Sequence, residues 1–251
     1  MAQPHSPTRT IAALLLLAAA AAVLASLGRW QLHRADERRA VRAQIEAGRA
    51  RPPIALASDT PPAELQAWRP ARARGTWLHD LTVLVDRNQE GRPGQWVATP
   101  LLLEGSRTAV LVLRGWVPRP LPGQPATEIP RPAGPQDVQG ELALRVPRLF
   151  ELWSFGGKEV AQLPARLPAG GAPPEVQNLD LQDYARATGL ELLPAVLEQT
   201  GPASGLAGEW PQPSIDSDQN MGYAMQWFGF TGIAVVAWLV VAWRAWRRRR
   251  A

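Results

Sequence analysis

The sequence predicts a membrane protein of the α+β class, in which two terminal transmembrane helices flank a mainly antiparallel β domain, built as a small barrel or a meander. Two observations predict the helices. Residues 11–27 and 221–243 are uncharged and largely apolar, and each run is long enough to span the roughly 30 Å hydrocarbon core of a bilayer. A third observation predicts the β domain, because short apolar runs between the helices alternate with turns rich in Pro and Gly, which is typical of strands with tight connections.

Residues 11–27 form the first predicted transmembrane helix, after a short N-terminus of residues 1–10. They consist of Ile, Ala, Leu and Val with one Ser. A cleavable signal peptide is the alternative interpretation, because Ala-rich stretches contain small-residue cleavage sites. Helix-forming residues follow the apolar run without a break, so the helix is expected to extend to about Ala47 and to stop at Gly48.

Residues 28–220 are predicted to contain five strands and one short helix. The expected strands are Arg72–Leu78, Leu81–Asn88, Gln95–Leu103, Thr108–Val117 and Val138–Val146. The helix is expected at Leu179–Ala187, with Asp180 near its start and Gly189 beyond its end. Residues 118–135, which include seven prolines, and residues 164–174 are expected to be extended, poorly ordered connections.

Residues 221–243 form the second predicted transmembrane helix, followed by the basic tail 244–251. Aromatic residues lie near both of its ends, as in the aromatic belts of membrane helices. They are Tyr223, Trp227 and Phe228 at one end and Trp243 and Trp246 at the other.

The charges beside the two helices predict that both termini are cytoplasmic and that residues 28–220 are periplasmic. Five arginines follow the second helix, while Asp216 and Asp218 precede it, and positive charge is retained on the cytoplasmic side. Arg29 and further arginines after the first helix argue for the opposite orientation. The C-terminal charges decide, because Asp36 and Glu37 offset the first cluster.

The composition excludes several functions. The formal net charge of +5 equals the five arginines of the C-terminal tail, so residues 1–243 are neutral and offer no basic surface to nucleic acid. The absence of Cys excludes disulfides, thiolate metal sites, covalent haem attachment and a catalytic thiol. Three His residues are too few for a histidine metal cage, and no nucleophile elbow, His–Glu pair or phosphate loop is present, so no enzyme is predicted.

A polar and aromatic cluster lies where the first predicted helix meets water. Its members are Gly28, Trp30, Gln31 and Arg34. Their i,i+3 and i,i+4 spacing places an amide, an indole and a guanidinium on one helix face. That face could hold a carboxylate, such as a haem propionate or an acidic residue of a partner, or it could simply anchor the helix at the membrane interface.

A second cluster lies at the start of the second predicted helix. Tyr223, Gln226 and Trp227 share one face at i, i+3 and i+4 spacing. Gln226 is polar and enters hydrocarbon, so it needs a partner, which is expected on the first helix. Close packing there would be permitted by Gly222, Gly229 and Gly232. A purely structural contact between the helices is the alternative.

Two further clusters lie on the predicted strands. One consists of Asp86-Arg87-Asn88, Gly94 and Thr99-Pro100-Leu101, and the other is Arg114-Gly115-Trp116 at a strand end. Gly115 permits close approach of a backbone or a ligand, while Trp116 offers a flat apolar surface and Arg114 a charge. Turn formation and local pairing, as between Asp86 and Arg87, explain the same residues structurally.

Taken in order, these motifs resemble the Surfeit locus protein one family of cytochrome oxidase assembly factors. The matching segments are Leu27–Arg34, Asp86–Asn88 with Gly94 and Thr99–Leu101, Leu113–Pro118, and Gly222–Phe228. Residues 119–217 match only loosely. The resemblance implies a non-enzymatic inner-membrane factor that binds haem a, or that holds the catalytic subunit of a haem–copper oxidase ready for haem insertion. Enzymes of haem a synthesis are further candidate partners, and the short N-terminus points to a bacterial member.

One position departs from the family pattern. Members commonly carry a His three residues before the Tyr of the second helix, which is the proposed iron ligand, and here that position is Asn220. Because a carboxamide is a poor iron ligand and neutral imidazole a good one, ligation at Asn220 is not expected. His33 is the nearby substitute, and His79 is expected to be a turn residue. The alternative function is a membrane-tethered envelope binding or scaffold protein that involves no haem.

Overall fold

The computed structural model of the 251-residue chain describes residues 7–121, 123–125, 127–148, 162–168, 170–200, 206, 208 and 210–250. The chain divides into two compact units. The helix unit consists of residues 1–43 and 213–251, and the sheet unit consists of residues 44–212.

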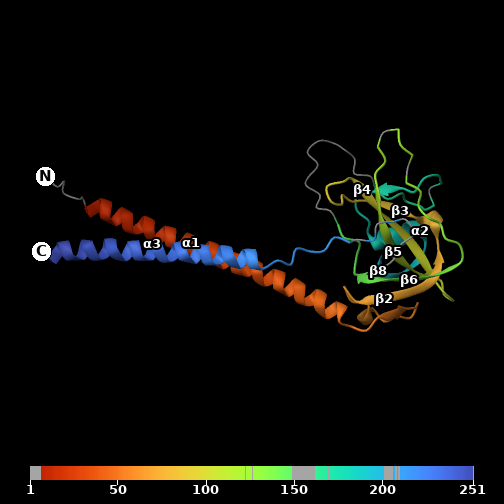
Figure 1. The fold of residues 1–251 in the computed structure, drawn as a ribbon, viewed down its shortest axis with the longest axis horizontal. Coiled ribbons are helices and arrows are strands. Elements are labelled where there is room, and N and C mark those ends of the chain that lie inside the picture. The colour runs from red at the N-terminus through yellow and green to blue at the C-terminus, as the bar shows by residue number, and fades with distance from the viewer. Residues whose placement is uncertain are drawn as a thin grey trace. The chain divides into compact units, whose positions relative to one another are not determined.

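Two long helices form the helix unit and lie side by side (Figure 1). They are α1 (Pro7–Arg49) and α3 (Asp218–Arg250), and by length and composition both could cross a membrane. They contain the predicted segments 11–27 and 221–243.

The expected stop of α1 at Gly48 is wrong, because the helix ends at Arg49. A Cβ atom at Gly48 would lie 2.6 Å from the carbonyl oxygen of Ala67 and 2.7 Å from Cβ of Trp68. The last turns of α1 belong to the sheet unit, and the glycine there allows the helix to pack closely against the Ala67–Trp68 backbone.

The side chains that α1 and α3 bury or half-bury recur at alternating steps of three and four residues. On α1 they include Thr10, Leu14, Leu17, Ala21, Leu24, Gly28, Gln31, Ala35 and Arg38, and on α3 Asn220, Ala224, Trp227, Thr231, Ala234, Trp238, Val241 and Ala245. This heptad spacing is that of helices packed along a left-handed seam. The close packing expected at Gly222, Gly229 and Gly232 is not found, because a Cβ at each would have no atom within 4 Å.

Among the residues described, the sheet unit contains one mixed sheet of eight strands. They are β1 (Ile54–Leu56), β2 (Pro70–Trp77), β3 (Val83–Asp86), β4 (Gly94–Leu103), β5 (Thr108–Pro118), β6 (Pro135–Ala143), β7 (Glu175–Val176) and β8 (Glu191–Gln199). The strand order is β1-β2-β6-β8-β5-β4-β3-β7, and β2 also pairs with β4. β3, β4 and β5 form an antiparallel meander, whereas β1–β2, β5–β8 and β3–β7 are parallel pairs.

The five predicted strands are found as β2 to β6 with shifted ends. The segment Leu81–Asn88 shortens to Val83–Asp86, because a 3₁₀ helix, η2 (His79–Leu81), occupies its start. The segment Val138–Val146 moves to Pro135–Ala143. A second 3₁₀ helix, η1 (Pro62–Glu64), precedes β2. The described residues of 119–134 and 164–174 lie outside helices and strands, as expected for connections.

β8 was not predicted, and it changes the sheet from a meander to a mixed sheet. It pairs in parallel with β5 and antiparallel with β6. Its register with β5 shifts between the pairs Ala109–Leu192 and Leu111–Val196. Pro194 lies inside that shift, and proline has no N–H group to donate to a neighbouring strand.

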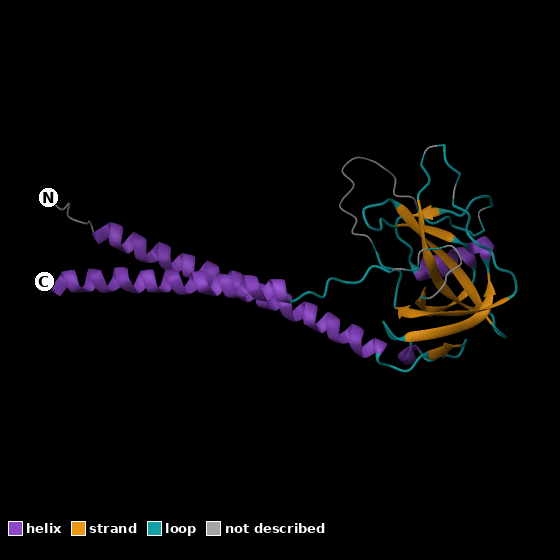
Figure 2. Cartoon of the chain, viewed as in Figure 1, coloured by secondary structure: helices purple, strands orange, loops and turns teal. Residues whose placement is uncertain are grey.

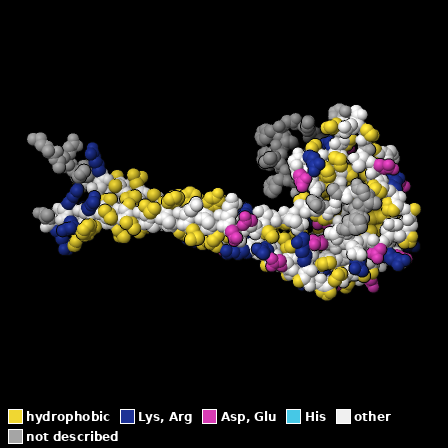
Figure 3. Space-filling model, in the orientation of Figure 1, with side chains coloured by type: hydrophobic (Ala, Val, Ile, Leu, Met, Phe, Trp, Pro, Cys, Tyr) yellow, Lys and Arg dark blue, Asp and Glu magenta, His cyan; other side chains and the backbone are white. Residues whose placement is uncertain are grey.

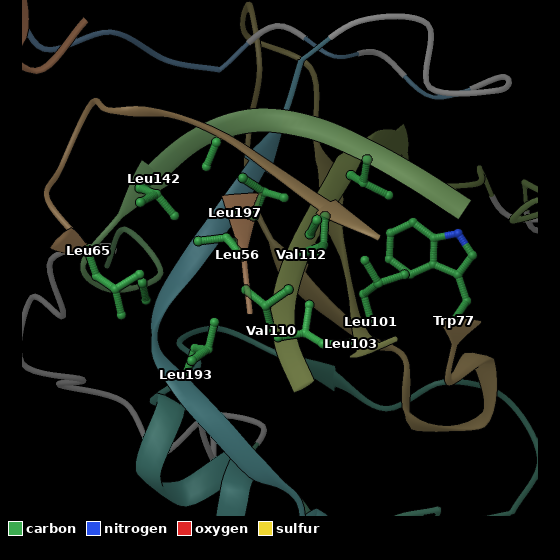
Figure 4. Packing of buried hydrophobic residues seen from close by; sticks show 14 residues of the cluster. Leu56, Leu65, Trp77, Leu101, Leu103, Val110, Val112, Leu142, Leu193 and Leu197 are labelled. Carbon is green, nitrogen blue, oxygen red and sulfur yellow. The ribbon is translucent and has the colours of Figure 1, made fainter. Parts of the chain in front are cut away.

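Hydrophobic side chains are buried on both faces of the sheet. On one face, residues of β2, β4, β5, β6 and β8 pack together with Leu56 and Leu65 (Figure 4). On the other, strands β3 to β5 pack against α2 (Leu181–Thr188) and its buried Tyr184 (Figure 2). The predicted helix Leu179–Ala187 is found two residues later at its start and one at its end, and the predicted capping residues are confirmed. The Asp180 carboxylate accepts hydrogen bonds from the first turn, and Gly189 adopts a left-handed φ of 71°.

Candidate functional site

The helix unit contains a polar contact between α1 and α3. The Nδ2 amide of Asn220 donates a hydrogen bond of 2.7 Å to Oε1 of Gln31. The Oδ1 atom of Asn220 is buried and has no hydrogen-bond partner among the described residues. One turn away, a Cβ at Gly28 would lie 2.9 Å from the ring of Phe228. Gln31, Asn220, Gly28 and Phe228 define the helix junction.

The other predicted residues of α1 do not join this junction. Trp30 is 55% exposed. Arg34 donates a hydrogen bond of 2.8 Å to Oε2 of Glu37. The side chain of His33 is 75% exposed, and its Nε2 atom lies 3.3 Å from Oε1 of Glu37. The shared face expected for Gln31, Trp30 and Arg34 is therefore divided between the helix contact and the exposed surface.

The predicted cluster on α3 is also divided. Trp227 is half-buried and meets Phe230 edge-on, with ring centroids 6.1 Å apart. Tyr223 is 44% exposed. Gln226 is exposed and makes no hydrogen bond to a residue that the structure describes, so the polar contact with α1 expected from Gln226 is made by Asn220 instead.

The helix junction does not fit axial ligation of a haem iron by α3. Asn220 stands where the resemblance places an imidazole, and its amide nitrogen is already bonded to Gln31. A carboxamide oxygen is a weak ligand for haem iron, which imidazole binds well. No group of three or more metal-ligating His, Cys, Asp or Glu residues exists among the residues that the structure describes.

In the sheet unit, Arg87 joins three segments of backbone. Its Nη1 atom donates to the carbonyl of Gln177 at 2.7 Å, and its Nη2 atom donates to the carbonyl of Pro147. The guanidinium lies 4.8 Å from the ring centroid of Trp96. Burial lowers the pKa of Arg87 to about 10, and Asp86 acts in the opposite direction. These contacts give Arg87 a structural role, because every one of them is made to the fold itself.

The other members of this predicted cluster surround Arg87. Trp116 Nε1 donates a hydrogen bond of 2.8 Å to the Arg87 carbonyl, and a Cβ at Gly94 would lie 2.2 Å from the Trp116 ring. The Asp86 carboxylate accepts from Gln95 at 3.0 Å. The structure thus brings together residues that sequence analysis singled out separately. Thr99 and Pro100 lie in the same strand as Gly94. Thr99 is fully buried, and its hydroxyl lies 3.0 Å from that of Thr82.

Arg114 is directed by a β-bulge. The register between β4 and β5 shifts from the pair Val97–Gly115 to the pair Ala98–Leu113, so Arg114 is the extra residue. Gly115 has a φ of 149°, a backbone conformation that residues other than glycine rarely adopt. The bulge places Arg114 beside Trp77, while Trp116 packs on the opposite face with the cluster around Tyr184.

The Arg114 guanidinium is buried, and no described carboxylate lies within salt-bridge distance of it. The residue is 3% exposed, and its guanidinium carbon lies 4.8 Å from the ring centroid of Trp77. Nη2 donates to the carbonyl of Pro130 at 2.7 Å, whereas Nη1 has no hydrogen-bond partner among the described residues. Burial lowers the pKa of Arg114 to about 10.

A cavity of about 390 Å³ lies beside the segment that contacts Arg114. Its lining includes His79, Thr82, Gln95, Ile129 and Arg131. Nε2 of His79 lies 3.1 Å from the carbonyl of Pro132, and Nδ1 of His79 is buried without a described partner. His79 lies in η2 between two strands, as expected of a turn residue. The contacts with Pro130 and Pro132 were missed, because the sequence indicates only a proline-rich connection there.

Comparison with known proteins places these features in one family. The SURF1 family model matches residues 18–232, which include the helix junction and the whole of the sheet unit. A SURF1-like protein from Monosiga brevicollis is 25% identical over 234 residues, covering 85% of this chain and 81% of the relative. The chain belongs to the SURF1 family.

Proposed function

We propose that this chain is a membrane-anchored assembly factor of a haem–copper terminal oxidase, which assists haem a insertion into the catalytic subunit and catalyses no reaction itself. The family match over residues 18–232 carries the proposal, because membership of the SURF1 family suggests a role in cytochrome oxidase assembly. The partner is the catalytic subunit, and enzymes of haem a synthesis are further candidates.

The proposal places both helices across a bacterial inner (plasma) membrane. Two observations support it: α1 and α3 each contain an apolar stretch long enough to cross a bilayer, and five arginines follow the apolar stretch of α3. Both termini are then cytoplasmic and residues 28–220 periplasmic. A reporter that is active only in the periplasm, fused after residue 250, is expected to be inactive, whereas the same reporter inserted after the exposed Gly105 is expected to be active.

The proposal assigns haem contacts to residues other than Asn220. Arg34 and Arg114 offer positive charge to propionates or to acidic residues of the oxidase, and Trp227 offers an aromatic surface. His33 is the remaining candidate ligand near the helix junction, and its side chain is exposed. Haem a, when bound by the oxidase, supplies the redox chemistry, and this chain acts by holding and orienting its partners.

One observation favours the alternative, a membrane-tethered scaffold without bound haem. The Asn220 amide is bonded to Gln31, so the residue at the expected ligand position joins the two helices. A scaffold needs the helix pair and the sheet unit but no iron ligand.

Deletion and complementation test the proposal. A strain that lacks this chain is expected to lose terminal oxidase activity and haem a in the purified catalytic subunit, and fully active, normally haemylated oxidase in that strain would refute the assembly role. Complementation with His33→Ala separates the two versions. If the chain co-purifies with a Soret band that His33→Ala removes, haem binding is direct, whereas co-purification with oxidase subunits in the absence of haem supports the scaffold. Arg29→Ala, a neighbouring exposed position outside the junction, is the matched control.

A further inference from the structure

The end of the helix pair that carries both chain ends is strongly basic (Figure 3). The chain has no Asp or Glu before Asp36 and none after Asp218. Within the helix unit, this leaves Arg9 on α1 and the arginines of the last turns of α3 without a nearby carboxylate. No acidic side chain along the paired apolar stretches therefore neutralises the positive charge at this end.

These arginines are not all equivalent. A groove of about 620 Å³ between the start of α1 and the end of α3 is lined by Arg9, Arg244, Arg248 and Arg249. Arg247 instead lies 5.0 Å from the ring centroid of Trp243, outside the groove lining. One set of guanidinium groups thus converges on a shared groove, while a neighbouring guanidinium is held against an aromatic ring.

The groove continues into an apolar wall. Its lining includes Ile11 and Leu14 from α1 and Val241 and Ala242 from α3, all of which belong to the apolar stretches of the two helices. A ligand that fits this surface combines a negatively charged head with a hydrocarbon chain. Free phosphate satisfies the arginines but leaves the apolar wall uncovered.

We propose that this groove binds the phosphate headgroup of an anionic phospholipid, with an acyl chain lying along Leu14 and Val241. The inference rests on the membrane anchoring given under the proposed function. Basic pockets between membrane helices at the cytoplasmic surface recognise such headgroups, and guanidinium forks match phosphate oxygens bidentately. The lipid would join α1 to α3 at the end opposite the Gln31–Asn220 contact.

The test uses the full chain in a mild detergent and a fluorescent phosphatidylglycerol whose binding is titrated. The variant Arg9→Gln/Arg248→Gln removes one groove arginine from each helix. The control Arg247→Gln/Arg250→Gln removes the same amount of charge from the same end of the helix pair, at two arginines that lie over tryptophan rings and outside the groove lining. The groove variant is expected to bind roughly thirtyfold more weakly than the wild type, whereas the control is expected to bind within about threefold.

Competition identifies the ligand. Unlabelled phosphatidylglycerol is expected to displace the probe, while phosphatidylcholine and inorganic phosphate at the same concentration are not. Equal weakening in the groove and control variants would overturn the inference, because it would indicate a diffuse basic tail. Displacement by inorganic phosphate alone would also overturn it, because the site would then take phosphate rather than a lipid.

Recovery of the chain separates this inference from the proposed function. A chain that is absent from the membrane fraction would overturn both the anchoring and the groove. A chain that is recovered in membranes and supports oxidase assembly, but shows no preference for anionic lipid, would overturn the groove inference alone. Thermal unfolding of both double variants is expected to match the wild type, so that a loss of lipid binding is not a loss of folding.

Discussion

Glu198 makes the sheet unit less stable as the pH rises. This residue lies in β8 and is 7% exposed, and it stands directly opposite Glu141 of β6. Arg49 is close to both carboxylates, but it donates its hydrogen bonds to Glu141, at 2.8 and 3.0 Å, and to Gln212, at 2.8 Å. The pKa of Glu198 is raised from 4.5 to about 7, chiefly by burial and also by the neighbouring Glu141 carboxylate, while Arg49 acts in the opposite direction.

The sign of the pH effect follows from proton linkage. Between pH 4.5 and about 7 the folded protein holds this proton while the unfolded chain has lost it, so the free energy of unfolding falls as the pH rises through that window. The full effect of such a pKa difference is about 3 kcal/mol. Most of it, about 2 to 3 kcal/mol, is lost between pH 5 and pH 8.

The variant Glu198→Gln keeps the shape of the protonated side chain and removes the titration. At pH 8 we expect it to raise the free energy of unfolding by about 2 to 3 kcal/mol, and at pH 5 by less than about 1 kcal/mol. The assay is denaturant unfolding of the full chain in detergent, followed by tryptophan emission at both pH values. Glu191→Gln, an exposed position at the start of the same strand, is the control and is expected to change neither value. Parallel pH profiles for wild type and Glu198→Gln would refute the reasoning.

Three further predictions follow from the contacts described above. Gly94→Ala places a methyl group into the Trp116 ring and is expected to lower the free energy of unfolding by about 2 to 4 kcal/mol. Exposed Gly105→Ala is the comparison for backbone strain without a clash, because the added Cβ meets no atom within 4 Å but the residue has a φ of 71°. In the otherwise cysteine-free chain, Gln31→Cys/Asn220→Cys is expected to be joined by a short bismaleimide in membranes, and no cross-link would contradict the helix junction. Arg114→Met is expected to change the free energy of unfolding by less than about 1 kcal/mol, because no described carboxylate partner is lost. In a complementation assay the same variant is expected to reduce haem a incorporation into the oxidase. Full incorporation would remove Arg114 from the functional residues.

Local patterns predicted the elements whose signals are local. The uncharged runs identified α1 and α3, and short apolar runs between turns, such as Thr108–Val117, identified β2 to β6. β8 was missed because Glu191, Pro194 and Glu198 interrupt its apolar pattern. Burial of Glu198 depends on strands and helix ends that are distant in the sequence, and β7 forms only because β3 offers a free edge. Strand order is a property of these distant pairings, which periodicity does not contain.

The candidate residues show the same limit. Helical spacing placed Tyr223, Gln226 and Trp227 on one face of the second helix, but spacing does not say which face meets another helix. Gln226 was therefore expected to contact the first helix, and the heptad of buried positions gives that place to Asn220. Gly115 was expected to permit close approach of a backbone or a ligand. In the structure it instead completes the bulge that directs Arg114.

Two buried arginines of the sheet unit then differ in one respect that bears on function. Arg87 and Arg114 are both nearly inaccessible, both lie 4.8 Å from a tryptophan ring centroid, and burial lowers the pKa of each to about 10. Arg87 leaves no buried nitrogen without a partner among the described residues, whereas Arg114 leaves Nη1 unpaired. An unpaired buried donor costs about 1 to 3 kcal/mol, which a structural residue avoids by bonding within the fold. Arg87 therefore holds the surrounding strands in place by bonding within the fold, whereas Arg114 keeps one buried donor that no described residue uses.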